Sequence, residues 1–299
     1  MTMQKLLLLA ALMLVLGSCA HTTFQSVRAF ERGDYSSALR GFEERAALGD
    51  VDAQFFLGLM YDEGKGVEAN AVEAVRYYEI AARRGHLAAS NNLGLCYFSG
   101  RGVPKDTRRA IELYQEAAAS SFAPAITNLG VLRLFGYRNG DTVEGQNLAD
   151  ARRLLERASE LGDTKALRIL GFLHRQGLGV PKDERLSRTY YERAATAGDL
   201  TAHYYLATLY LGPNEGFVDT DAPADPSNEN HARGVEHMRI AAEGGLAPAQ
   251  FGMGLVYLRG IKVDADAGEA RAWMQRAAEQ GLRAAKDKLA VMTAAAPTR

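Results

Sequence analysis

The stretch "GRGVPKD" at residues 100–106 returns almost unchanged as "GLGVPKD" at residues 177–183. A catalytic loop is normally needed once, whereas a phrase that recurs is typical of a repeating architecture. Glycine suits a tight turn, proline suits a position that needs no backbone N–H, and the closing aspartate suits the start of a helix. The sequence therefore predicts a turn between two helices that is repeated along the chain, and not a phosphate-binding loop.

Three columns of residues extend this turn into a repeating unit of 36 residues. A leucine-type residue, mostly followed by glycine, recurs at steps of 36, 36, 41, 36, 47 and 36 residues. An alanine stands four residues before each of these positions and an apolar residue stands three residues after it, so the columns share one helix face. This predicted helix is helix A of each unit, and the leucine-type positions are Leu57, Leu93, Leu129, Leu170, Leu206, Met253 and Leu289.

A second predicted helix, helix B, follows the turn in every unit. It opens with Asp or Asn, which predicts N-caps because their side-chain oxygens accept unpaired backbone N–H groups. The openings are Asp34, Asn70, Asp106, Asn147, Asp183, Asn230 and Asp266. Glycine, which tolerates a left-handed backbone, is expected to end most copies. These ends are Gly49, Gly85, Ser121, Gly162, Gly198, Gly245 and Gly281.

Small residues on both helices would let two backbones approach closely, while leucines and tyrosines would fill the gaps to the next unit. One hairpin cannot bury such a stripe alone, so the copies are expected to stack. The pattern thus predicts an all-α solenoid of stacked antiparallel helix hairpins.

The stretch "AASNNLGLCYFSGRGVPKDTRRAIELYQEAA" (88–118) resembles the Sel1-like repeat, a relative of the tetratricopeptide repeat. The resemblance implies a right-handed superhelix that acts as a protein-binding scaffold or adaptor. Residues 24–49 resemble one tetratricopeptide hairpin. Residues 282–293 are expected to form a closing helix A, and residues 294–299 are expected to be a disordered tail. The six expected Sel1-like units are 50–85, 86–121, 122–162, 163–198, 199–245 and 246–281.

The first residues carry a different signal. Lys5 precedes an apolar run of 11 residues, which is the length of a signal-peptide core and too short to span a bilayer. The run ends in "LGSC" (16–19), which resembles a bacterial lipobox and implies that Cys19 carries a lipid anchor. Residues 1–18 would then be a lipoprotein signal peptide and 19–23 a short linker. The alternative is an ordinary secretory signal that contains a cysteine.

This resemblance also implies a location. Ala20 follows the cysteine in place of the Asp that would retain a lipoprotein in the inner membrane. This points to an outer-membrane lipoprotein that faces the periplasm. The membrane would be reached through the lipid alone. Without residues 1–18, which contain one of the 35 basic residues and no acidic one, 34 basic residues face 36 acidic ones. This balance argues against a nucleic-acid partner.

No catalytic constellation is evident in the sequence. G-x-S-x-G, H-E-x-x-H, C-x-x-C and Walker patterns are absent, so we expect no catalysis, no metal and no cofactor. Cys96 lies in the apolar column of helix A and is expected to be a buried, inert thiol. The histidines fall in different repeats without ligand spacing and are expected at the surface or at helix ends. They are His86, His174, His203, His231 and His237.

A partner-binding groove is expected along helix A, because helix A lines the concave side of the superhelices that the resemblance implies. Asparagine can pair with a peptide backbone, arginine can meet a carboxylate, and tyrosine offers rigid apolar surface. The alternative is that the aromatic residues pack between repeats and the asparagines are merely solvated. The candidate residues are Phe55, Phe56, Asn91, Asn92, Asn128, Arg168, Arg175, Tyr204, Tyr205 and Phe251.

Two insertions, at 136–146 and 212–230, break the period and are further candidates for binding. Within the second, "DTDAPAD" (219–225) lacks the glycine and the closing glutamate of a calcium loop, so a solvated loop is favoured.

Together these features predict a lipid-anchored periplasmic scaffold that binds a protein or peptide partner in the cell envelope. The alternative is a structural subunit of an envelope secretion or polysaccharide-export assembly. The sequence specifies neither the partner nor the oligomeric state.

Overall fold

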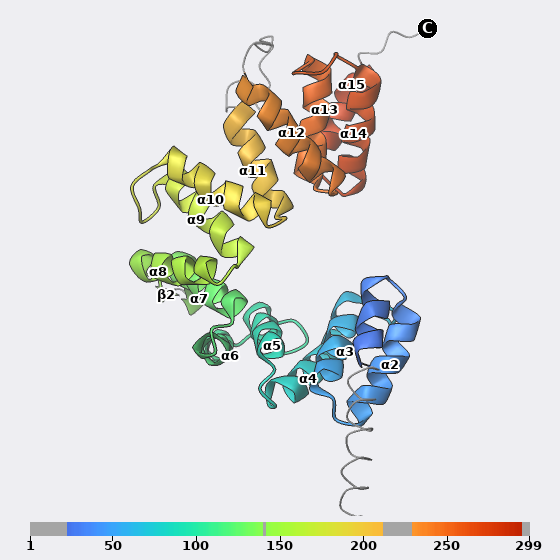
Figure 1. Ribbon diagram of the computed structural model, residues 1–299, viewed down its shortest axis with the longest axis vertical. Helices are drawn as coiled ribbons and strands as arrows, with labels where there is room; N and C mark the ends of the chain where they lie inside the picture. The colour runs from blue at the N-terminus through green and yellow to red at the C-terminus, as the bar shows by residue number, and fades with distance from the viewer. Residues whose placement is uncertain (1–22, 140–141, 212–228, 295–299) are drawn as a thin grey trace, which may run out of the picture. The chain divides into compact units, whose positions relative to one another are not determined.

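The computed structural model describes residues 23–139, 142–211 and 229–294 (Figure 1). The chain forms two compact units, residues 1–157 and 158–299. The stretch expected to be a signal peptide, the expected lipidation residue Cys19, most of the second insertion and the tail from residue 295 lie outside the described residues. Among the helices that are described, none is long and apolar enough to cross a membrane.

Helices in the N-terminal unit alternate as the 36-residue period predicts. Residues 23–31 are helical, and the elements that follow are α2 (Tyr35–Ala47), α3 (Val51–Glu63), α4 (Ala71–Ala82), α5 (Leu87–Ser99), α6 (Thr107–Ala119), α7 (Ala123–Phe135), β1 (Tyr137–Asn139) and β2 (Thr142–Glu144). Helix α8 (Leu148–Glu160) carries the chain across the boundary between the units. Odd-numbered helices from α3 onward are the A helices, and even-numbered ones are the B helices.

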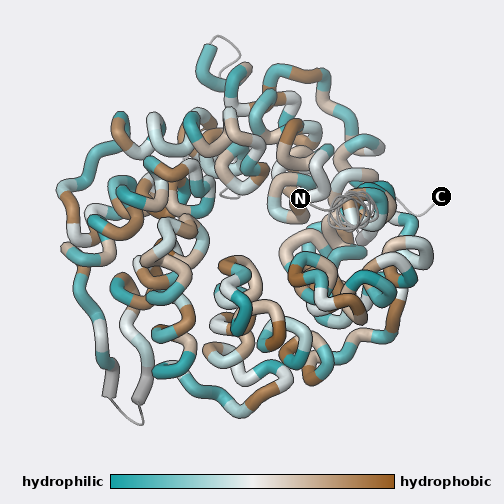
Figure 2. The backbone as a smooth tube through the Cα atoms, turned by 60° about the horizontal axis from the view of Figure 1, so that its bottom comes forward, coloured by the Kyte–Doolittle hydropathy of each residue, from teal (hydrophilic) through white to brown (hydrophobic). Residues whose placement is uncertain are grey.

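The C-terminal unit continues the same alternation. Its elements are α9 (Thr164–Gln176), α10 (Glu184–Thr196), α11 (Leu200–Leu211), α12 (Glu229–Glu243), α13 (Ala247–Arg259), α14 (Ala267–Glu279) and α15 (Arg283–Ala294). Within the units, A helices pack on the B helices that follow them, as α3 does on α4 and α9 on α10, and B helices pack on the next A helix, as α4 does on α5 and α10 on α11. The predicted α-solenoid of stacked antiparallel hairpins is confirmed within each unit. Figure 2 shows apolar segments distributed along the helices, which fits a core shared among many small interfaces.

The first insertion departs from the all-α prediction. Its strands β1 and β2 pair in antiparallel fashion, with Tyr137 opposite Glu144. The backbone N–H of Asn147 donates to the carbonyl of Arg133 at 2.7 Å, and the Arg133 guanidinium donates to the carbonyl of Gly145 at 3.2 Å. The insertion therefore leaves and rejoins the solenoid at one point, and its backbone groups pair with each other as a hairpin.

The predicted N-caps of the B helices are largely confirmed. Asp106, for example, accepts the N–H of Arg109 at 2.9 Å, and Asp183 accepts the N–H of Leu186 at 2.9 Å. Asn230 is an exception, because α12 already begins at Glu229. The A helices have caps that the sequence columns did not reveal, and these are Asp50, His86, Asp163 and Asp199.

The glycine after the leucine column receives a large side chain from the B helix. A Cβ at Gly94 would lie 2.6 Å from Cε1 of Tyr114, whose side chain is fully buried. Gly58 meets Tyr78 and Gly171 meets Tyr191 in the same way. Each tyrosine also packs against the next A helix, for example Tyr78 against Leu93 of α5, so the expectation that tyrosines fill the gaps to the next unit is confirmed.

The second glycine of the "GRGVPKD" turn contacts the preceding repeat. Gly102 has φ +74°, and a Cβ there would overlap the carbonyl group of Ala71, the first residue of α4. The turn is therefore fixed by two needs: a left-handed backbone and a close approach between backbones.

Candidate partner-binding surface

The two phenylalanines on α3 pack between hairpins. Phe56 stacks on Phe42 with ring centroids 4.8 Å apart, so it fills the interface between α2 and α3. Phe55 stacks on His86 at 4.4 Å, where His86 caps α5 by accepting the N–H of Ala89 at 3.1 Å. The packing alternative therefore describes Phe56, and both rings remain half-buried.

The three asparagines form a chain of hydrogen bonds between α5 and α7. The amide of Asn128 donates to Oδ1 of Asn91 at 2.9 Å, and the Asn91 amide donates to Oδ1 of Asn92 at 3.3 Å. Asn92 in turn bonds the hydroxyl of Tyr78. Asn91 is only 6% exposed, so the alternative in which the asparagines are merely solvated is wrong for this residue.

This chain of hydrogen bonds ends at a carboxylate that the sequence did not single out. The Tyr78 hydroxyl donates to Oδ2 of Asp62 at 3.2 Å, and Asp62 also pairs with Arg101 in the turn of the next repeat. Burial raises the pKa of the Tyr78 hydroxyl, so it remains a donor. Burial likewise raises the pKa of the Cys96 thiol, which is 1% exposed, and the prediction that this cysteine is buried is confirmed.

The two arginines on α9 tie it to α11. Nε of Arg168 lies 3.1 Å from Oδ2 of Asp199, and the same carboxylate accepts the N–H of Ala202 at 2.9 Å. Nη1 of Arg175 donates to Oγ1 of Thr208 at 3.1 Å. The carboxylate that faces Arg168 is thus supplied by the chain itself.

The tyrosine pair on α11 forms a partly exposed aromatic surface. Tyr205 stacks on Tyr191 of α10 with centroids 5.2 Å apart, and Tyr204 lies 5.7 Å from Tyr205. Both tyrosines are half-buried, and burial raises the pKa of Tyr204. A ring that is held on one side and exposed on the other is suited to contact a partner.

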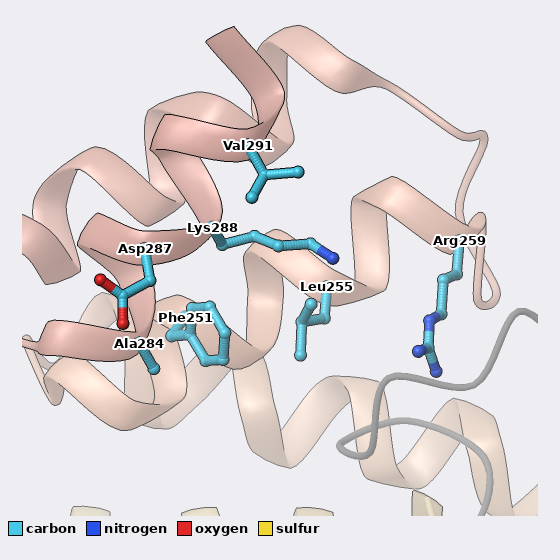
Figure 3. Close-up of a pocket in the computed structure, with 7 residues that line it drawn as sticks. All are labelled: Phe251, Leu255, Arg259, Ala284, Asp287, Lys288 and Val291. Atoms are coloured by element: carbon cyan, nitrogen blue, oxygen red, sulfur yellow. The ribbon is translucent and has the colours of Figure 1, made fainter. Parts of the chain in front are cut away.

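Phe251 lines a pocket between α13 and α15 of about 290 Å³ (Figure 3). The helices contribute Phe251, Leu255 and Arg259 from α13 and Ala284, Asp287, Lys288 and Val291 from α15. Phe251 was among the candidates from the sequence, whereas the residues of α15 were not.

A second pocket of about 290 Å³ lies between the B helices α4 and α6, over α5. Both of its arginines form ion pairs within their own helices: Arg83 lies 3.1 Å from Glu79, and Arg109 lies 2.8 Å from Glu112.

Three of the histidines lie at helix ends, as predicted. His86 caps α5, His174 is in the last turn of α9 and His231 is in the first turn of α12, although the last two are also buried. His203 of α11 and His237 of α12 come together, with their Nδ1 atoms 2.8 Å apart. Over the ranges that the structure describes, no group of three His, Cys, Asp or Glu side chains is arranged to hold a metal ion.

The candidate residues are thus brought together in small groups within each unit. Phe55 and Phe56 form one group and the three asparagines another in the N-terminal unit. The arginines, the tyrosine pair and the Phe251 pocket belong to the C-terminal unit.

The family model of the Sel1 repeat matches more than half of the chain, over residues 51–86, 87–122, 123–163, 164–199, 225–246 and 247–282. The chain belongs to the Sel1 repeat family. The resemblance inferred from residues 88–118 is therefore confirmed. Sel1 repeat proteins generally serve as scaffolds that bind other proteins.

Two curated relatives of this Sel1 repeat protein match 137 of its residues, or 46% of its length. The chitin synthase regulator SKT5 of Malassezia restricta is 33% identical over that stretch, which is 9% of the regulator. The chitin synthase regulatory factor 3 of Schizosaccharomyces pombe is 34% identical over 14% of its length. The match thus spans only a small part of these relatives.

A solved Sel1 repeat protein from Oxalobacter formigenes is similar over most of its length. It is 29% identical with a TM-score of 0.67, and the alignment covers 86% of this chain and 99% of that one.

Proposed function

We propose that this Sel1 repeat protein is a lipid-anchored adaptor that binds a protein partner at the cell envelope through the faces of its A helices. The observation that carries the proposal is the set of half-buried aromatic, amide and guanidinium groups on α3, α5, α7, α9 and α11. Hydrogen bonds, ion pairs and ring stacking hold these groups in place. The lipid on Cys19 would confine the complex to the periplasmic face of the outer membrane.

Side chains that are already held in place favour recognition. A partner pays less entropy when the receptor's side chains are ordered before binding. Tyr204 and Tyr205 are anchored by stacking, and Phe55 by its contact with His86, so each presents a fixed ring. Such rigid aromatic groups are typical centres of binding energy.

The names of the curated relatives support action through another protein. Both are regulators of chitin synthase, and the similarity to them lies within 137 residues of this chain. We propose that this chain likewise acts by binding and has no catalytic activity of its own.

Site-specific photo-crosslinking in cells that express the full chain tests this function. A photo-reactive residue is placed at Phe55 or Tyr204 on A helices, and at the exposed Arg108 or Gln275 on B helices as matched controls. We expect one partner to be captured from the A positions and not from the B positions. Capture from the B positions alone would contradict the adaptor proposal and favour a structural subunit that buries its outer surface.

The anchor is tested separately. Cys19→Ala is expected to abolish labelling by radioactive palmitate and to move the protein from the membrane fraction to the periplasmic fraction. Labelling that persists in this variant would contradict lipidation at Cys19, while leaving the crosslinking result intact.

A further inference from the structure

Two large apolar side chains are exposed at the end of the N-terminal unit from which its first helix starts. Phe24, in the helix of residues 23–31, is 58% exposed, and Leu48, which follows the last residue of α2, is 74% exposed. The Thr23 hydroxyl donates to Oδ2 of Asp50 at 2.7 Å, so the start of the first helix lies against the turn between α2 and α3. Phe24 and Leu48 therefore belong to the same end of this unit.

The backbone that carries these two side chains is held in place by neighbouring elements. Nε of Arg45 donates to Oγ1 of Thr23 at 3.3 Å, and Nη2 of Arg45 lies 3.4 Å from Oδ2 of Asp50. Arg84, just beyond α4, donates to the carbonyl of Gly49. Exposed apolar side chains on a fixed backbone are suited to enter a second surface, because burial removes them from water and little order has to be gained.

The proposed lipid anchor lies close to this end along the chain. Three residues separate Cys19 from Thr23, where the first helix begins. Even a fully extended chain spans at most about 14 Å over the four steps from Cys19 to Thr23. A lipid on Cys19 would thus keep Phe24, and with it the turn that carries Leu48, at the surface of the bilayer.

The charges at this end do not favour an acidic surface in particular. The Arg28 guanidinium lies 5.9 Å from the centre of the Phe24 ring and is exposed. Glu44 and Asp52 are exposed carboxylates on the helices that flank the turn. An arginine beside an inserted ring can reach lipid phosphates while its stem covers apolar surface, and the carboxylates offset its attraction to anionic lipid. Contact with a bilayer would therefore depend mainly on apolar burial.

We propose that Phe24 and Leu48 enter the boundary between the headgroups and the acyl chains of the membrane that holds the anchor. This inference rests on the proposed lipid at Cys19. Phenylalanine and leucine are typical of protein surfaces that enter this layer. The contact would fix the orientation of the N-terminal unit: the turn between α2 and α3 faces the lipid. The start of α4 faces water, because it lies about 18 Å along that helix from Arg84.

The test uses the full lipidated chain in phosphatidylcholine vesicles, with and without phosphatidylglycerol. A nitroxide is attached at Leu48→Cys, or at Val72→Cys as the matched control, because Val72 is 62% exposed at the start of α4. The wild type gives the background labelling. Electron paramagnetic resonance compares the access of oxygen, which concentrates in the bilayer, with that of a nickel chelate, which stays in water. We expect the label at position 48 to be reached by oxygen and shielded from the chelate in both lipid mixtures, and the label at position 72 to show the reverse.

A further variant tests whether apolar burial causes the shielding. Phe24→Ser, with the label at position 48, is expected to lower the ratio of docked to undocked orientations about tenfold, because burying one such side chain is worth at least that factor. Val72→Ser removes an exposed apolar side chain from the other end of α4 and should leave the ratio unchanged. Circular dichroism confirms that each variant keeps its helical content.

Several results would overturn the inference. Equal access of the nickel chelate to both labels, in a chain that carries its lipid, would remove this inference alone and leave the anchor standing. Shielding of position 48 from oxygen as well as from the chelate would indicate a protein surface, such as a second copy of the chain. A chain without lipid at Cys19, as shown by mass spectrometry, would remove both the anchor and this inference, while crosslinking at Tyr204 would still test the adaptor function.

Discussion

Replacing Gly102 by alanine is expected to weaken the contact between two neighbouring repeats. The residue has φ +74°, and the added Cβ would lie 2.5 Å from the carbonyl carbon of Ala71 and 3.0 Å from the backbone nitrogen of Val72. Carbon atoms in favourable contact are about 3.5–4.0 Å apart. The overlap of about 1 Å is with backbone atoms, which cannot rotate away as a side chain can.

Two costs add at this position. A left-handed backbone costs a residue with a Cβ about 1–2 kcal/mol. Forcing extra volume into a packed interface costs about 1–3 kcal/mol more. We therefore expect Gly102→Ala to lower the free energy of unfolding by about 3 kcal/mol.

Gly85 provides a matched control, because its φ is +84° and a Cβ there would meet nothing within 4 Å. Gly85→Ala should show only the backbone cost, about 1 kcal/mol. Urea denaturation followed by circular dichroism compares the two variants. Hydrogen exchange at the start of α4 should increase in Gly102→Ala and not in Gly85→Ala. Because solenoids need not unfold in one step, the exchange data locate the change.

Equal destabilisation of the two variants would refute this reasoning. The strain would then be local to each glycine, and the close approach between the turn and α4 would contribute nothing to stacking.

Three further predictions concern single positions. Ser121 follows the end of α6 with φ +59°, which favours glycine. Ser121→Gly should therefore raise the free energy of unfolding by about 0.5–1 kcal/mol, although it removes the hydrogen bond from Arg157, and thermal denaturation measures this change. Asn91→Ala should cost about 1–3 kcal/mol, because it removes buried hydrogen bonds, and a double-mutant cycle with Asn128→Ala should show coupling. Burial lowers the pKa of His203 and His237 below the usual value of about 6.5, so the unfolded chain binds more protons and stability should fall as the pH drops below that value. A flat profile between pH 7 and 5 in the wild type, or an unchanged slope in a variant with both histidines replaced by Gln, would contradict this.

Carboxylates around the histidine pair moderate its pH dependence. Asp199 lies near His203, and Glu192 and Glu236 lie near His237, and all three favour the protonated imidazole. One hydrogen lies between the two Nδ1 atoms when both rings are neutral. A first added proton can bind to Nε2 of the ring that donates this hydrogen, which leaves the bond between the rings intact. A second proton would have to bind to the accepting Nδ1 and would place two N–H groups face to face. The pair should therefore separate only when both rings are charged.

The periodic features of the fold could be predicted because each unit needs the same residue type at the same place. Asp106 caps a helix and Gly102 adopts a left-handed backbone, and residues with the same roles recur at the 36-residue period. The β1–β2 hairpin escaped prediction because it occurs once and follows no column. Its short strands are held by the contact between Arg133 and Gly145, which is a matter of tertiary structure.

The candidate surface was only partly predictable, because its contacts join residues of successive A helices. Asn91 and Asn128 are 37 positions apart, whereas Arg168 and Asp199 are 31 apart. Neither separation equals the 36-residue period, since the tilt between stacked helices decides which side chains meet. Sequence columns therefore identified the residues on this face but not their partners.

These contacts between repeats decide how binding can be separated from stability. A change at Asn91 or Arg168 removes a bond that joins two A helices, so a loss of partner binding there would have two possible causes. Partner affinity and thermal stability are therefore measured on the same variants. If the adaptor function is correct, Phe55→Ala or Tyr204→Ala will also weaken partner binding, whereas a loss of binding confined to Asn91 and Arg168 would leave lost stability as the cause.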